Sequence, residues 1–114
     1  MKATIIKGSE VNAVPCPCGM ARRILRPDLH GGPCGIHRVS ITAEAKKHFH
    51  KKTTECYVIL SGKGQIDLDD ATHDVAPDDV IFIPPMTRHA LRGQFEIINI
   101  VLPFFDSADE FVVE

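Results

Sequence analysis

The chain has 114 residues, a hydrophobic fraction of 44% and a formal net charge of −2 from 13 basic and 15 acidic side chains. This length suits one domain with its own core, and this composition excludes a disordered chain. The mixed charges argue against a nucleic-acid-binding or polybasic membrane surface. The sequence has neither a membrane-length apolar run nor an N-terminal signal peptide. We therefore expect one domain over residues 1–114, located in the cytoplasm, with no nucleic-acid or membrane partner.

Short segments rich in Val, Ile and Phe recur along the chain, separated by Gly, Pro and Asp. This pattern is typical of β-strands. Helical periodicity is nearly absent, apart from one possible turn at residues 43–47. Regularly spaced strands without helices predict an all-β sandwich or barrel. The predicted strands are residues 3–7, 21–26, 36–42, 54–60, 64–68, 79–83, 88–91 and 95–102.

The segment 48–62 carries the clearest chemical pattern. His48 and His50 are two residues apart, so on a strand both side chains project from one face. Glu55 begins the next apolar run and can face the two imidazoles across a short turn. Two imidazoles and a carboxylate that converge indicate a divalent metal site. The alternative is a solvated loop, because four lysines flank the histidine pair.

The segment 77–93 contributes a third histidine. A turn signal at residues 77–79 precedes a short apolar strand, which the pair Pro84-Pro85 ends. His89 follows shortly after this strand end.

The first segment resembles the first sequence motif of the cupin family, G-x5-H-x-H-x3–4-E-x6-G. His48, His50, Glu55 and Gly62 match this motif. Thr42 stands in place of its first glycine.

The second segment resembles the second cupin motif, G-x5-P-x-G-x2-H-x3-N. Pro84 and His89 match it at the right spacing. Asp78 and Met86 replace its two glycines, and Gly93 replaces its asparagine. The chain therefore departs from the motif at its turns, where a non-glycine residue resists a positive φ.

The two motifs cover about residues 42–62 and 78–93. The resemblance implies a double-stranded β-helix, which is a jelly-roll barrel of two antiparallel sheets. It also implies one divalent ion per chain. The ligand set suits iron, manganese, nickel, zinc or copper, and it leaves coordination positions open. The implied metal ligands are His48, His50, Glu55 and His89.

Two classes of function remain open. The first is a metalloenzyme for a small molecule, as a dioxygenase-like protein or as a sugar or sugar-acid isomerase or lyase. The second is a non-catalytic module that binds or senses a small ligand. We favour the enzyme, because a passive protein would leave a full ligand set idle.

Catalysis also requires an acid or base, and the sequence offers few. Tyr57 shares the strand face of Glu55, and His37 shares a face with Val39 and Ile41. Both can equally be core residues. No carboxylate beyond Glu55 is assigned to the pocket, so Tyr57 and His37 are the weak catalytic candidates. Tyr57 is also a candidate for substrate binding.

Arg22 and Arg23 are adjacent, so on a strand only one of them faces inward. The inward arginine can bind a substrate carboxylate or phosphate. The sequence does not decide which of the two it is.

The pair Cys16 and Cys18 can bind a soft metal ion, with Cys34 as the one possible third thiol, or can serve packing alone. Segments 55–60 and 95–102 are apolar on both faces. Such strands need a second covering layer, so we predict a homodimer.

Overall fold

The computed structural model describes residues 2–42 and 46–113, and most of this part of the chain is β-strand. No helix in the described part is long and apolar enough to cross a membrane. The short helix α1 (Pro27–His30) and two 3₁₀ turns, η1 (Gly8–Glu10) and η2 (Ser107–Asp109), accompany the strands. The strands are β1 (Val14–Cys16), β2 (Gly19–Leu25), β3 (Gly35–Ile41), β4 (His48–Phe49), β5 (Thr54–Leu68), β6 (Ala71–Val75), β7 (Val80–Ile83), β8 (His89–Leu102) and β9 (Phe111–Val112).

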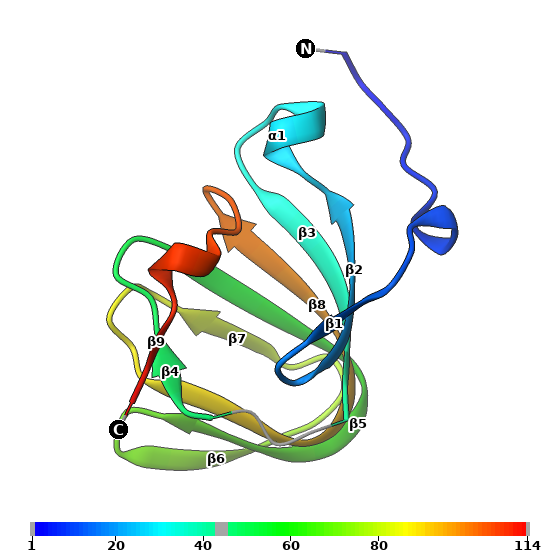
Figure 1. Cartoon of the computed structure of the whole chain (residues 1–114). Helices are drawn as coiled ribbons and strands as arrows, with labels where there is room; N and C mark the ends of the chain where they lie inside the picture. Colours follow the sequence, from blue (N-terminus) through cyan, green and yellow to red (C-terminus); the bar gives the residue numbers. More distant parts are fainter. Residues whose placement is uncertain (1, 43–45, 114) are drawn as a thin grey trace.

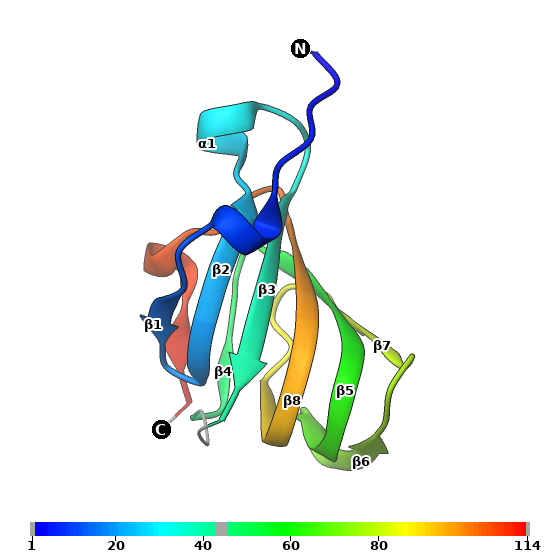
Figure 2. The same cartoon turned by 90° about the vertical axis from the view of Figure 1, so that its right-hand side faces the viewer.

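Two long strands, β5 and β8, pair antiparallel over their whole lengths. All nine strands form one continuous hydrogen-bonded sheet. The early and late halves of β5 and β8 have different neighbours, so this sheet folds over into two layers, which we call the first and the second sheet. The first sheet has the order β1-β2-β3-β8-β5-β7, and these strands lie side by side in Figure 2. The second sheet contains β9, β4, the start of β8, the end of β5 and β6. Figure 1 shows β4 and β9 on the opposite side of the fold from β2 and β3. The predicted all-β double-stranded β-helix is confirmed.

The bend between the two sheets falls at glycines. Gly62 and Gly93 have φ values of 96° and 134°, which side chains rarely adopt. A Cβ atom on Gly62 or Gly64 would overlap the backbone of β8, at Gln94 or Arg92. The glycine that ends the first motif therefore lets β5 and β8 fold over together. This continuity also explains why the four predicted strands 54–60, 64–68, 88–91 and 95–102 are only two.

The core fills the space between the sheets and comes from alternate residues of the strands. In β5, Glu55, Tyr57 and Ile59 point inward, as the alternation predicts. Each fully buried aliphatic side chain contributes roughly 1.5–3 kcal/mol to folding. The most buried aliphatic residues are Ile59, Ile66, Ile83, Ile97 and Val101.

Some predicted elements are wrong. Residues 3–7 form no strand, and Ile5 is 83% exposed, because no neighbouring strand pairs with this segment. Four strands were not predicted, namely β1, β4, β6 and β9, because they are short or polar. The predicted helical turn at residues 43–47 falls partly on residues 43–45, which lie outside the described residues; Lys46 and Lys47 are not helical.

The two residues that replace motif glycines keep the glycine conformation. Asp78 has a φ of 74° and Met86 a φ of 70°. Pro84, Pro85, Met86 and Thr87 form a turn in which the Thr87 N–H donates to the Pro84 carbonyl at 3.4 Å. Proline second and a positive φ third define a type II turn, which favours glycine at the third position. The Met86 N–H also donates to the His50 carbonyl at 2.6 Å, so this turn holds the end of β4.

A buried carboxylate ties the C-terminal segment to the turn between β4 and β5. Asp109 is only 5% exposed. Its Oδ1 accepts from the Lys51 N–H, and its Oδ2 accepts from the Lys52 N–H and from the N–H and hydroxyl of Thr53, each at 3.0 Å. This turn joins His50 to Glu55, so Asp109 sets the spacing between these two residues.

We expect Met86→Gly to stabilise the protein. The substitution removes about 1–2 kcal/mol of left-handed strain, and the extra freedom of glycine in the unfolded chain offsets part of it. The free energy of unfolding from urea denaturation should rise by about 0.5–1 kcal/mol. Met86 is 50% exposed, so little burial is lost. Met86→Ala keeps the strain and serves as the control. An equal rise in the free energy of unfolding in both variants, or a rise in neither, would show that backbone strain at residue 86 does not limit stability.

The Asp109 tie predicts a pH-dependent loss of stability. Burial alone would raise the pKa of Asp109, but the N–H groups of Lys52, Lys51 and Thr53 outweigh it and hold the pKa at about 2. The folded-state pKa lies below the unfolded value of ~3.9, so the stabilisation is complete above pH ~4 and disappears as the pH falls through 2.

Asp109→Asn should therefore lower the Tm at pH 7, and the difference from wild type should shrink between pH 4 and 2. Thermal unfolding at several pH values measures this difference. Asp106→Asn is the matched control, because the exposed Asp106 side chain accepts, among the described residues, a single hydrogen bond from the Ala108 N–H. A Tm difference independent of pH would show that the charge of Asp109 is not responsible.

Candidate metal centre and adjoining cavities

The four predicted metal ligands lie together inside the barrel. One ligand atom from each of His48, His50, Glu55 and His89 lies within 4.8 Å of all the others. His48 in β4 pairs directly with His89, the first residue of β8. His50 follows β4, and Glu55 enters from the opposite sheet near the start of β5. Two segments that are distant in sequence, residues 48–55 and the start of β8 at His89, thus supply one cluster.

Backbone carbonyls fix the tautomers of two imidazoles. His89 Nδ1 lies 2.9 Å from the Thr87 carbonyl oxygen, and His48 Nδ1 lies 3.0 Å from the Lys46 carbonyl oxygen. A carbonyl can only accept, so Nδ1 carries the proton in each neutral ring and Nε2 keeps a free lone pair. Metal-binding histidines are typically oriented in this way.

Glu55 and His89 place two acceptors against each other. Glu55 Oε2 accepts from Asn99 Nδ2 at 2.7 Å, whereas Oε1 lies 3.2 Å from His89 Nε2 and 3.3 Å from His50 Nδ1. Among the residues that the structure describes, Glu55 Oε1 and His89 Nε2 are buried without a hydrogen-bond partner. Such a buried pair is costly unless a cation lies between the two atoms. The donor set therefore fits a divalent metal ion.

The protonation states also suit a metal. Burial lowers the pKa of His48, and the neighbouring His89 lowers it further. Burial raises the pKa of Glu55, but His89, His50 and Asn99 outweigh this effect and leave it below the usual value. At neutral pH an ionised carboxylate thus faces a neutral His48 imidazole, as metal binding requires.

The cluster opens into a cavity of about 400 Å³, which we call the metal-side cavity. Tyr57 lines it, and burial raises the pKa of this phenol well above 10, so the hydroxyl stays protonated. The residues that line the metal-side cavity are Cys16, Pro17, Cys18, His37, Val39, Ile41, Lys46, His48, His50, Glu55, Tyr57, Ile97, Asn99, Phe105, Glu110 and Val112.

Two polar residues of this cavity were missed by the sequence analysis. Glu110 Oε1 lies 3.5 Å from His48 Nε2, so the expectation that no further carboxylate lines the pocket is wrong. Glu110 arrives because β9 pairs with β4, and nothing local in the sequence signals this return. Asn99 could have been found, because it shares a strand face with the buried Ile97 and Val101.

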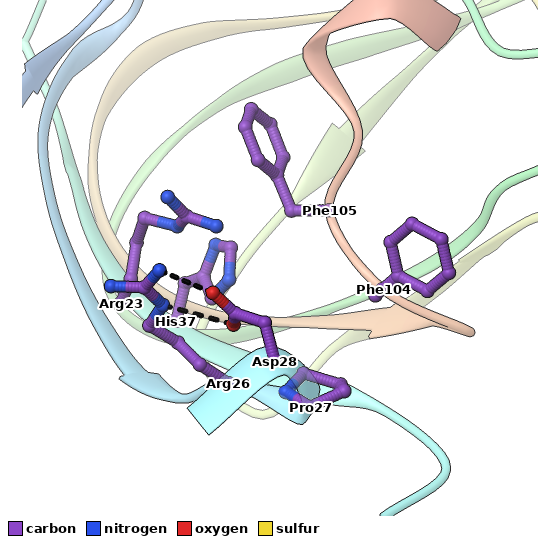
Figure 3. Close-up of a pocket in the computed structure, with 7 residues that line it drawn as sticks. All are labelled: Arg23, Arg26, Pro27, Asp28, His37, Phe104 and Phe105. Carbon is purple, nitrogen blue, oxygen red and sulfur yellow. Dashed lines mark hydrogen bonds and ion pairs between the residues drawn. The ribbon is translucent and has the colours of Figure 1, made fainter. Parts of the chain in front are cut away.

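A second cavity, of about 470 Å³, adjoins the first and shares His37 and Phe105 with it. We call it the arginine-side cavity. Arg23 lines it, whereas Arg22 is exposed, so the two adjacent arginines do take opposite faces. His37 is buried, and burial followed by the nearby Arg23 lowers its pKa to about 4. Figure 3 shows its lining residues, which are Arg23, Arg26, Pro27, Asp28, His37, Phe104 and Phe105.

The pair Cys16 and Cys18 also lies at the metal-side cavity. The two Sγ atoms are 3.4 Å apart, and Cys34 does not line this cavity. Burial, with Cys16 beside it, raises the pKa of Cys18 to about 12. The Cys18 thiol therefore stays protonated at neutral pH.

Comparisons with known proteins agree with this architecture. An uncharacterized protein of Methanocaldococcus jannaschii is 33% identical over 75 residues, which are 63% of this chain and 60% of that protein. The chain thus spans about 60% of the length of the curated relatives it matches.

Solved structures extend the likeness over nearly the whole chain. A crystal structure of a protein from Planctomyces limnophilus has a TM-score of 0.90 at 38% identity and covers 96% of each chain. Streptomyces Pac13, described as a nucleoside dehydratase and also solved with uridine, has a TM-score of 0.79 at 21% identity over 99% of this chain and 92% of its own. At 21% identity this second likeness concerns the fold alone.

The model of the cupin domain family matches residues 36–100, which make up more than half of the chain and contain all four residues of the cluster. The chain therefore belongs to the cupin family.

Proposed function

We propose that this protein is a divalent-metal-dependent enzyme that acts on a small molecule in the metal-side cavity. The observation that carries the proposal is the buried pair of facing acceptors, Glu55 Oε1 and His89 Nε2, at an open cavity. A cavity of about 400 Å³ suits a small substrate. A structural site would be closed, whereas this one is reachable.

The ion would be held by His48, His50, Glu55 and His89. Iron, manganese, nickel, zinc and copper all suit three imidazoles and one carboxylate. When bound, such an ion supplies Lewis-acid polarisation of a substrate oxygen.

The protein's own residues supply acid and base around this position. The Glu110 carboxylate, at the cavity wall beside His48, can accept a proton from a substrate carbon or hydroxyl. The protonated Tyr57 hydroxyl can donate a hydrogen bond to a substrate oxygen. This pair favours an isomerase or lyase over a dioxygenase-like activity, because proton transfer needs a protein base. The same pair also favours an enzyme over a sensing module, because a sensing module would not need Glu110 as a base.

Two matched glutamate variants test the proposal. Glu55→Gln keeps the side-chain volume and should remove most of the metal, together with any turnover. Glu110→Gln should keep the metal and lower kcat by about 10²–10⁴-fold, as expected for loss of a general base. Metal is measured by mass spectrometry on protein purified without a metal-affinity tag, and turnover in a screen of sugars, hydroxy acids and oxo acids.

Occupancy should also decline as the pH falls below ~6.5, because protons then compete for the imidazole nitrogens. His73→Ala is the control, because His73 lies on β6 outside the cluster. Full metal occupancy in Glu55→Gln would refute the ligand assignment. Ligand binding without any turnover in wild type would favour the sensing module.

We further propose that the protein is a homodimer through the outer face of β5 and β7. Val80 and Phe82 in β7 are each 64% exposed, and their partners in β5 are Val58 and Cys56. β7 pairs only with β5 within the described residues, so it is also an edge that another chain can cover. Burial of such a face on a second copy would remove exposed apolar surface.

Phe82→Glu should convert the dimer to a monomer, because a charge would then be buried at the interface. Light scattering coupled to size exclusion at micromolar concentration measures the mass. Leu29→Glu is the matched control, because Leu29 in α1 is 65% exposed but lies on a different element. A monomeric wild type, or a dimer that Phe82→Glu leaves intact, would overturn this interface.

A further inference from the structure

The arginine-side cavity contains a positive charge that no described residue neutralises. Arg23 forms no ion pair within residues 2–42 and 46–113, and its Nε is buried there without a hydrogen-bond partner. Register explains why it points inward, because Arg23 pairs with the buried His37 across β2 and β3. A half-buried guanidinium without a counter-ion is costly, so the site favours an anion.

The other two charges of this cavity cancel. Arg26 contacts Asp28 through two hydrogen bonds, Nη2 to Oδ2 at 2.5 Å and Nε to Oδ1 at 3.2 Å, drawn in Figure 3. These bonds hold the pKa of Asp28 below its usual value, so the pair stays ionised. The described lining therefore carries a net charge of one positive unit, on Arg23.

Aromatic rings form the wall opposite these charges. Phe104 and Phe105 follow β8 and remain 50% and 42% exposed. Arg23 lies over the Phe105 ring, at 4.8 Å from its centre, and His37 meets the same ring edge-on at 5.9 Å between centres. Figure 3 shows Phe104 on the far side of the cavity from Arg23 and His37. The Arg23–Phe105 contact leaves no room between these two groups, so a flat apolar group would lie between them and the Phe104 ring.

We propose that the arginine-side cavity binds the carboxylate of a small organic acid with a flat apolar body, Arg23 holding the carboxylate and Phe104 and Phe105 the body. A single uncompensated positive charge matches a carboxylate, whereas a phosphate monoester carries nearly two negative charges. Because this cavity shares His37 and Phe105 with the metal-side cavity, such an acid can extend toward the metal cluster. The site assigns a substrate class to the proposed enzyme, and in that respect it rests on the proposed function.

The test uses metal-free protein, so that binding is read without any contribution from a metal ion. Phenylacetate is titrated into ¹⁵N-labelled protein and followed by nuclear magnetic resonance. We expect shifts at the Arg23 side-chain N–H and at the backbone of Phe104 and Phe105. Phenylacetamide, which lacks the charge, and phenyl phosphate, which carries more charge, should both bind at least about fivefold more weakly.

Adjacent arginines provide the matched variants. Arg23→Gln should weaken phenylacetate binding about tenfold or more, as expected for loss of a charge-assisted contact. Arg22→Gln removes the same charge from the exposed face and should change the Kd less than about twofold. The amide spectrum of each variant reports whether it is folded. If Arg23→Gln fails to fold, Arg23→Lys replaces it; this variant keeps the charge, so its affinity for phenylacetate should be lower than that of wild type but still measurable.

Absence of phenylacetate binding to wild type, equal weakening in both glutamine variants, or equal binding of phenylacetamide would overturn the carboxylate site. Tighter binding of phenyl phosphate would replace the carboxylate by a phosphate ligand. Carboxylate binding that depends on Arg23, in a protein that takes up no metal, would support this site and refute the proposed metalloenzyme. Metal uptake without phenylacetate binding would refute the carboxylate site and support the proposed metalloenzyme.

Discussion

The 3.2 Å approach of Glu55 Oε1 to His89 Nε2 exists only because the two longest strands fold over together. In the ladder of β5 with β8, Glu55 pairs with Val101 and His89 pairs with Leu68. Val101 and His89 are twelve residues apart, which is roughly 40 Å along a straight strand. The bend at Gly62 and Gly93 returns the far end of the ladder across the barrel.

The relative positions of the four cluster residues therefore depend on this bend and on the turn between β4 and β5. A bulkier residue at the bend, or a looser turn between β4 and β5, would move one ligand by several ångströms relative to the others. This dependence gives the type II turn at Met86 and the Asp109 tie a role beyond stability. The first holds the carbonyl of His50, and the second holds the three residues that follow it. Both act on the segment that joins two metal-ligand candidates, so both constrain the geometry in which an ion would be bound.

The four ligand candidates were identified through the resemblance to the two cupin motifs, and part of the information behind them is local. Alternation along a strand places His48 and His50 together, and a proline-terminated strand introduces His89. The same alternation predicted that one of Arg22 and Arg23 faces inward. It could not identify that residue, because the choice depends on the register of β2 against β3 and on the irregularity after Arg23.

Residues contributed by the returning chain could not be predicted. Glu110 and Asp109 lie in the segment after β8, and only the pairing of β9 with β4 carries them to the site. In the sequence, their side chains look like ordinary surface carboxylates. The prediction of a strand at residues 3–7 was wrong for a related reason, because a β-strand forms only where a neighbouring strand pairs with it. Apolar alternation without a neighbouring strand leaves Ile5 exposed.

The two joined cavities separate charge along their length. Glu55, Glu110 and Lys46 are the charged residues at the metal end, where a bound divalent ion would offset the two carboxylates, and Arg23 places a positive charge at the other end. His37 lies between them with a pKa of about 4, and it is neutral at pH 7. The two residues that the cavities share, His37 and Phe105, are thus uncharged, so charged contacts with a bound molecule would be confined to its two ends. Proton transfer would then be confined to the metal end, where Glu110 lies beside His48 and where the Tyr57 hydroxyl, which stays protonated near neutral pH, can donate a hydrogen bond.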